Sequence, residues 1–180
     1  RTFILPVAPA RSVQRSAREI RASYGIAADA PLVTIVARHH PQKNLPMFLD
    51  AMRLVRERLP DVRGLMVGDG PERGALEAHR HALGLDDTVV IAGMQPNPVD
   101  EMHAADVVAL TSDWEGSPLV VAECLAVGRP LVTTAVGTVR RHLVDGENAR
   151  IVAIGDPRAM ADALAELLVD RSLAAAIGAA

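Results

Sequence analysis

Six short apolar segments constrain the fold of this chain more than any other feature of its sequence. They are rich in β-branched residues, and the clearest of them, LVTIVA at 32–37, contains a single polar residue. Continuous apolar runs of this length are typical of parallel strands that are covered on both faces. We expect strands at 32–37, 63–67, 89–92, 107–110, 130–133 and 150–154.

Helical patterns fill the intervals between these segments. Apolar residues recur three and four positions apart, and glycine or proline follows the pattern, as at Gly25 and Pro60. We expect helices at 12–24, 45–59, 75–83, 99–104, 118–127 and 138–143, then from 157 and from 172.

The order of strand, loop and helix predicts an α/β fold: a Rossmann-like parallel sheet of about six strands with helices on both faces. In such sheets ligands bind at the carboxyl ends of the strands. Each loop that is rich in glycine or charge follows a predicted strand, so we expect these loops at one edge.

The length of 180 residues suits one hydrophobic core. We expect residues 1–30 to be a leading segment and a helix that arrive from an N-terminal half. Residues 31–180 then form a single domain with them, and the last helical pattern is still incomplete at Ala180.

Composition and charge exclude several classes of protein. The formal net charge of -3 and the aromatic content of 2% argue against a nucleic-acid binder, which needs a basic surface and stacking side chains. No apolar stretch is long enough to span a membrane and no signal peptide opens the chain, so we expect a cytoplasmic protein. Cys124 is the only cysteine, which excludes an internal disulfide.

The stretch DWEGSPLVVAECLAV at 113–127 carries the strongest functional signal. Ser117 followed by Pro118 predicts a helix start, because the hydroxyl can accept from free N–H groups and proline suits the first helical turn. The helix that follows is apolar nearly all round, so we expect it to be buried on several sides, with Glu123 as a lone buried carboxylate.

Glu115 lies just before this helix and Glu123 about two turns along it. At ~1.5 Å per residue the two carboxylates can flank a ligand roughly 8 to 10 Å long. The helix start between them favours phosphate. A diphosphate with a hydroxyl-rich group on each side fits this arrangement, and a surface glutamate beside a structural ion pair is the alternative.

Two other loops lie at the same predicted edge. Arg38 and Lys43 follow the first strand, where they can neutralise a diphosphate or simply be surface cations. The segment 68–74, GDGPERG, resembles a dinucleotide fingerprint but lacks the acidic residue that should end the next strand. We interpret it as a tight turn with close backbone approach.

Metal and hydrolase chemistry are not expected. A zinc site needs three or four ligands at workable geometry, and His79 and His81, two apart on a predicted helix, diverge. Ser112 and Ser117 lack the glycine pattern of a nucleophile elbow.

Taken together, these residues resemble the C-terminal, donor-binding domain of family 4 retaining glycosyltransferases of the GT-B fold. The resemblance runs from about residue 31 to 168. It is carried by the Glu-x7-Glu pair with EGSPLVVAE, by the basic pair, by VGDGPER at 67–73 and by Gly128-Arg129-Pro130.

The resemblance implies roles for residues of this chain. Arg38 and Lys43 contact the diphosphate, Glu115 faces the donor sugar and Glu123 holds the ribose. The implied catalytic residues are therefore Arg38, Lys43 and Glu115. The loop after Gly93 contacts the nucleotide base. The implied donor-binding residues are Gly68, Gly70, Gly93, Met94, Gly116, Ser117, Pro118, Leu119 and Glu123.

The implied activity is transfer of a sugar from a nucleoside-diphosphate sugar to a sugar, lipid or protein acceptor, with retention and without a bound metal. The acceptor binds through an N-terminal domain, so we expect the isolated domain to bind donor weakly and to transfer nothing. Peripheral contact of the full-length enzyme with the inner face of the membrane is compatible with a lipid acceptor. A sugar-nucleotide epimerase of the same architecture and a non-catalytic domain that retains the fold are the alternatives.

Overall fold

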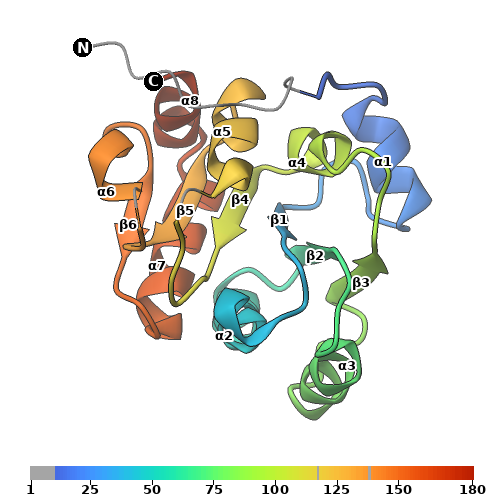
Figure 1. Ribbon diagram of the computed structural model, residues 1–180. Coiled ribbons are helices and arrows are strands. Elements are labelled where there is room, and N and C mark those ends of the chain that lie inside the picture. The colour runs from blue at the N-terminus through green and yellow to red at the C-terminus, as the bar shows by residue number, and fades with distance from the viewer. Residues whose placement is uncertain (1–10, 117, 138) are drawn as a thin grey trace.

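The computed structural model describes residues 11–116, 118–137 and 139–180. Six strands form one sheet in the order β3-β2-β1-β4-β5-β6, and all neighbouring pairs are parallel (Figure 1). The strands are β1 (Leu32–Val36), β2 (Arg63–Val67), β3 (Val89–Gly93), β4 (Val107–Leu110), β5 (Leu131–Thr134) and β6 (Arg150–Val152). The predicted α/β fold is confirmed.

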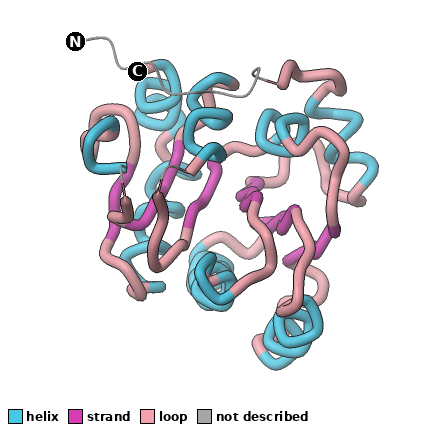
Figure 2. The backbone as a smooth tube through the Cα atoms, in the orientation of Figure 1, coloured by secondary structure: helices cyan, strands magenta, loops and turns pink. Residues whose placement is uncertain are grey.

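The helices cover both faces of the sheet, and the strands lie between them in Figure 2. The helices are α1 (Ala17–Ser23), the 3-10 turn η1 (Pro41–Lys43), α2 (Leu45–Arg58), α3 (Arg73–Ala82), α4 (Val99–Ala104), α5 (Leu119–Ala126), α6 (Val139–His142), α7 (Pro157–Val169) and α8 (Arg171–Ala179). Helices α2, α3 and α7 share one face, and α1, α4, α5 and α6 share the other.

Strand β4 shows why the strands are apolar throughout. Val107 and Ala109 pack with the α2 and α7 side, whereas Val108 and Leu110 pack with α4 and α5. Successive side chains of a strand point to opposite faces, so a strand covered on both sides has no polar face. Full burial of an aliphatic or aromatic side chain stabilises the fold by roughly 1.5–3 kcal/mol.

The predicted starts of helices α1 and α8 are wrong, and helix α3 begins at Arg73, two residues earlier than predicted. Helix α1 begins at Ala17 rather than at 12, because Ser16 and Glu19 form a capping box. The two backbone N–H groups before it, those of Gln14 and Arg15, bind the Asp100 carboxylate at 2.7 and 3.2 Å instead. Helix α8 begins at Arg171, one residue early, because the Asp170 carboxylate caps it.

The burial predicted for helix α5 is also wrong. Only Val121 and Cys124 of this helix are buried, and Leu119 is 56% exposed. Pro118 is the N-cap with extended backbone angles, φ -70 and ψ 110, so the helix begins one residue later than predicted. Ser117 lies outside the described residues. An apolar pattern shows which side chains can be buried, but not whether another element covers them.

Within the described ranges, no helix is both long enough and apolar enough to cross a membrane.

Candidate functional site

The strand order reverses between β1 and β4, and we refer to the carboxyl ends of these two strands, with the loops that follow them, as the crevice. The chain leaves β1 toward β2 on one side and leaves β4 toward β5 on the other. Ligands of doubly wound sheets bind at such switch points, at the carboxyl ends of the strands. The loop after β1 carries Arg38 and Lys43, and the loop after β4 carries Glu115.

Lys43 is held in place by the turn that contains it. Its backbone carbonyl accepts a hydrogen bond from Thr111 Oγ1 at 2.8 Å, and its side chain is 20% exposed. The next residue, Asn44, has a left-handed backbone with φ 43 and caps helix α2 by accepting from Met47 N at 3.4 Å. The backbone of Lys43 is therefore fixed between a turn and a helix start.

Glu115 meets Lys43 directly. The carboxylate is 7% exposed and forms an ion pair with Lys43 Nζ. It also accepts hydrogen bonds from Ser112 Oγ at 2.7 Å and from Gln42 Nε2 at 3.3 Å. Sequence reasoning placed Lys43 and Glu115 at one edge but missed Gln42 and Ser112, which supply the remaining donors to this carboxylate.

Further bonds join the two loops. Gln42 Nε2 donates to the Trp114 carbonyl at 2.9 Å, and the Gln42 carbonyl accepts from Asp113 N at 3.0 Å. Asn44 Nδ2 donates to Asp113 Oδ1 at 2.7 Å. The loops after β1 and β4 thus form one connected structure across the crevice.

Lys43 is the single lysine of a chain whose 19 basic residues are otherwise arginines. An ammonium is a compact point charge with three rotatable donors, whereas a guanidinium is a planar fork. The one position that departs from arginine is the position that faces Glu115 in the crevice.

Arg38 and Glu123 lie outside this bonded cluster. Arg38 is exposed, and Glu123 is half-buried on α5 rather than fully buried as predicted. Neither side chain makes a hydrogen bond or an ion pair within the described residues. Gly116, which follows Glu115 in the loop, is exposed.

The turn after β2 comes into direct backbone contact with the loop after β1. A Cβ atom on Gly68, whose φ is +134, would lie 1.9 Å from the Ala37 carbonyl oxygen. A Cβ atom on Gly70 would lie 2.4 Å from the His39 carbonyl oxygen. The predicted tight turn with close backbone approach is confirmed.

A hollow of about 340 Å³ opens beside this turn. It is lined on one side by Val36, Arg38 and Gly68 and on the other by Met94 and Gln95. Met94, which follows Gly93 at the end of β3, is among the most exposed apolar side chains. The hollow is therefore partly apolar and has a guanidinium at its rim.

The loop after β5 closes the other side of the site. Thr134 Oγ1 donates to the Ser112 carbonyl at 2.6 Å. Gly137 has φ +50, and a Cβ atom there would lie 2.1 Å from the Glu115 carbonyl oxygen. The backbone of Glu115 is thus bounded on both sides.

His39 is buried beneath the site without a hydrogen-bond partner for either ring nitrogen among the described residues. Burial lowers the pKa of His39 below its usual range, because removal from water disfavours the imidazolium. The Asp69, Glu72 and Glu77 carboxylates act in the opposite direction, and the Arg73 guanidinium acts in the same direction as burial. Protonation of His39 at low pH therefore destabilises the folded state.

Replacing His39 by leucine is expected to remove part of the acid sensitivity. A histidine with a lowered folded pKa stabilises the fold above its unfolded pKa, about 6.5, and that stability is lost as pH falls below this value. Leucine also removes a buried polar group without a partner, a gain of about 1–3 kcal/mol. Urea unfolding at pH 7.5 and 5.5 should show a larger advantage of the variant at pH 5.5. An equal advantage at both pH values, or the same result for the exposed His81→Leu, would contradict the assignment.

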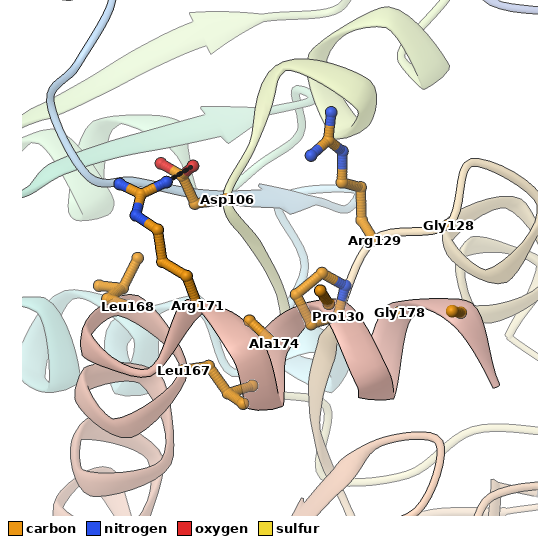
Figure 3. Close-up of a pocket in the computed structure, with 11 residues that line it drawn as sticks. Asp106, Gly128, Arg129, Pro130, Leu167, Leu168, Arg171, Ala174 and Gly178 are labelled. Atoms are coloured by element: carbon orange, nitrogen blue, oxygen red, sulfur yellow. Dashed lines mark hydrogen bonds and ion pairs between the residues drawn. The ribbon is translucent and has the colours of Figure 1, made fainter.

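A second hollow, of about 380 Å³, lies at the opposite edge of the sheet. Its walls include Arg129 and Pro130, which precede β5, and Asp106, which precedes β4 (Figure 3). Arg171 of helix α8 pairs with Asp106 at 3.5 Å. This hollow is at the amino ends of the strands, away from the bonded loops, so the crevice above β1 and β4 is the stronger candidate.

The histidines of helix α3 are engaged separately. His79 bonds Asp50 at 2.9 Å and His81 bonds Asp86 at 2.7 Å. Across the part of the chain that the structure describes, no group of three or more His, Cys, Asp or Glu residues is placed to hold a metal ion.

Comparisons with known proteins show the family to which this chain belongs. The family described as Glycosyl transferases group 1 matches residues 16–180. Alpha-D-kanosaminyltransferase from Streptomyces kanamyceticus is 32% identical over 157 residues, which are 86% of this chain and 40% of that protein. The chain spans about two fifths of the length of the curated relatives it matches.

Solved structures share the fold. The structure of Alr3699/HepE from Anabaena in complex with UDP-glucose has a TM-score of 0.84 at 24% identity and covers 91% of this chain and 45% of that chain. The C-terminal domain of a group 1 glycosyl transferase, LpcC, from Francisella tularensis has a TM-score of 0.77 at 23% identity, covering 92% and 89%. With the family match over most of its length, this chain belongs to the group 1 glycosyl transferases.

Proposed function

We propose that this chain is the donor-binding half of a retaining glycosyltransferase that takes a sugar from a nucleoside-diphosphate sugar. The observation that carries the proposal is the Lys43–Glu115 pair at the switch point, with Arg38 on the same loop and its side chain unpaired among the described residues. The named activities of the relatives, such as kanosaminyl transfer, support the general reaction.

The diphosphate is assigned to the loop after β1, which carries Arg38 and Lys43, and to the start of helix α5. Arg38 makes no bond within the described residues, so its guanidinium is available to an anion. The N-terminus of a helix adds free N–H groups and the positive end of a dipole. These groups stabilise the departing diphosphate, whose charge grows in the transition state.

The other parts of the donor are assigned to the groups around the diphosphate. We assign the base to the hollow beside Met94 and Gln95, and the ribose to Glu123. The sugar is assigned to Glu115 and to the backbone from Gly116 to Leu119. Arrival of a diphosphate draws Lys43 toward phosphate and frees one oxygen of Glu115 for a sugar hydroxyl.

The remaining features belong to the whole enzyme. We propose that the acceptor binds to an N-terminal domain that faces this edge, that the enzyme is cytoplasmic, and that Arg38 and Lys43 supply the charge neutralisation without a metal. An epimerase would interconvert nucleotide sugars without an acceptor, so incubation with donor alone separates the two reactions.

Calorimetric titration with UDP, GDP and ADP tests the site. We expect saturable binding of one nucleotide, weakened by Glu123→Ala. Glu147→Ala is the matched control, since this exposed glutamate precedes β6 at the opposite edge. If none of the three nucleotides binds the full-length protein, the remaining hypothesis is a non-catalytic domain that retains the fold.

The single lysine allows a second measurement. In a protein made of residues 1–180, an amine-selective acylating reagent has one side-chain target, Lys43, besides the amine at the N-terminus of that protein. Bound nucleoside diphosphate should protect Lys43 while the N-terminal amine reacts at an unchanged rate. Equal reaction of both amines with and without nucleotide would remove Lys43 from the diphosphate site.

A further inference from the structure

Trp114 is the only tryptophan of the chain, and it is 62% exposed to solvent. The other described aromatic side chains are packed: Phe48 is fully buried, and the Tyr24 hydroxyl donates to Glu101 Oε1 at 3.1 Å. An exposed large aromatic surface is unfavourable in water and often marks a contact with a ligand or partner.

The backbone around Trp114 is fixed on both sides. Before it, Asp113 is bonded to Gln42 and Asn44, and the Trp114 carbonyl accepts from Gln42 Nε2 at 2.9 Å. After it, the Glu115 carboxylate is held by Lys43 and Ser112. The indole is therefore exposed on an ordered loop, so a contact on it requires little ordering of the backbone.

The side chains of two adjacent residues turn in different directions. The Glu115 side chain is 7% exposed and turns into the loops, whereas Trp114 turns to solvent. Their Cα atoms are about 3.8 Å apart, as in any trans peptide. The indole is therefore carried by the residue next to the carboxylate to which the donor sugar is assigned.

The surroundings of the indole indicate the chemistry of its ligand. Asp113 is exposed, and Asn44 and Gln42, which bond Asp113 and the Trp114 carbonyl, are half-buried, so carboxylate and amide groups belong to the same bonded loops as the indole. A pyranose ring offers an apolar C–H face for the indole and hydroxyls around its edge for the polar groups.

We propose that Trp114 is a stacking surface for a sugar ring of the transfer reaction and determines which sugar is accepted. This inference rests on the proposed function. The ring belongs either to the donor sugar or to a sugar acceptor, and both offer the same face.

Kinetics of the full-length enzyme test the inference. We expect Trp114→Ala to raise the KM for one sugar substrate about 10-fold, which corresponds to about 1.4 kcal/mol, with kcat changed less than about twofold. Trp114→Phe should recover most of the affinity because it keeps an aromatic face. Val169→Ala, which trims another exposed apolar side chain on α7, should change nothing.

Fluorescence distinguishes the two sources of the ring. The signal of Trp114 is the part of the emission that is absent from Trp114→Phe. A change with UDP-glucose, GDP-mannose or ADP-glucose that the matching diphosphate does not produce assigns the donor sugar. A change when methyl α-D-glucopyranoside is added to the diphosphate-saturated enzyme assigns the acceptor.

Three outcomes overturn the inference: unchanged KM values in Trp114→Ala, an equal rise of both KM values with a lower melting temperature, or the full emission change with diphosphate alone. The proposed function fails separately, if wild-type enzyme binds no nucleoside diphosphate by calorimetry.

Discussion

Replacing Lys43 by alanine is expected to slow sugar transfer by the full-length enzyme by roughly 10- to 150-fold. The range corresponds to the loss of ~1.5 to 3 kcal/mol for a hydrogen bond to a charged group. The ammonium lies at the crevice, only 20% exposed, so water replaces it poorly as a partner for the diphosphate. Removal also leaves the Glu115 carboxylate with Ser112 and Gln42 as its hydrogen-bond donors.

The measurement is kcat/KM for Lys43→Ala, Glu115→Ala and the double variant. Because Lys43 and Glu115 bond each other, the two effects should not add. Arg58→Ala, which breaks an exposed ion pair with Asp162, is the control for loss of one positive charge and should have little effect. A Lys43→Ala enzyme within twofold of wild type would exclude Lys43 from the mechanism.

Replacing Gly68 by alanine is expected to destabilise the fold by at least about 3 kcal/mol, which is in the upper range for single substitutions. The backbone angle φ +134 is strained for any residue with a side chain. The new methyl group would also lie 1.9 Å from the Ala37 carbonyl oxygen, which cannot move without displacing the end of β1. Both effects oppose the native contact between the first two loops.

Gly74 provides a matched control in the same segment. It lies in helix α3, and a Cβ atom there would meet no atom within 4 Å. Gly74→Ala should therefore stabilise the protein by roughly 0.5–1 kcal/mol, through the better helix propensity of alanine. Denaturant midpoints of the two variants should move in opposite directions. A Gly68→Ala protein as stable as wild type would show that the turn can move away from Ala37.

The sequence predicted the sheet and its functional edge because both depend on local pattern. Short apolar runs predict the strands, and the periodic patterns between them predict the helices. The charged and glycine-rich loops that follow strands predict that the functional edge lies at the carboxyl ends of the strands. The contact between Lys43 and Glu115 could not be predicted from local pattern alone. It depends on β1 and β4 being neighbours in the sheet, although two strands separate them in sequence. Local pattern does not contain that order.

Helix α5 and Trp114 mark the limit of local pattern in another way. Leu119 has the hydrophobicity of a core residue and Trp114 that of a buried aromatic, yet both are exposed. Whether an apolar side chain is covered depends on the surrounding elements, not on its neighbours in sequence. Glu123 is half-buried rather than lone and buried for the same reason.

The bonds between the loops after β1 and β4 have an evolutionary consequence. Gln42 contacts Asp113, Trp114 and Glu115 through its backbone and side chain, so a substitution in one loop alters the conformation of the other. Mutations at these positions should show strong epistasis. Variants selected for a new sugar should therefore change Gln42 together with residues 113–115, whereas changes around the hollow at Met94 should accumulate independently.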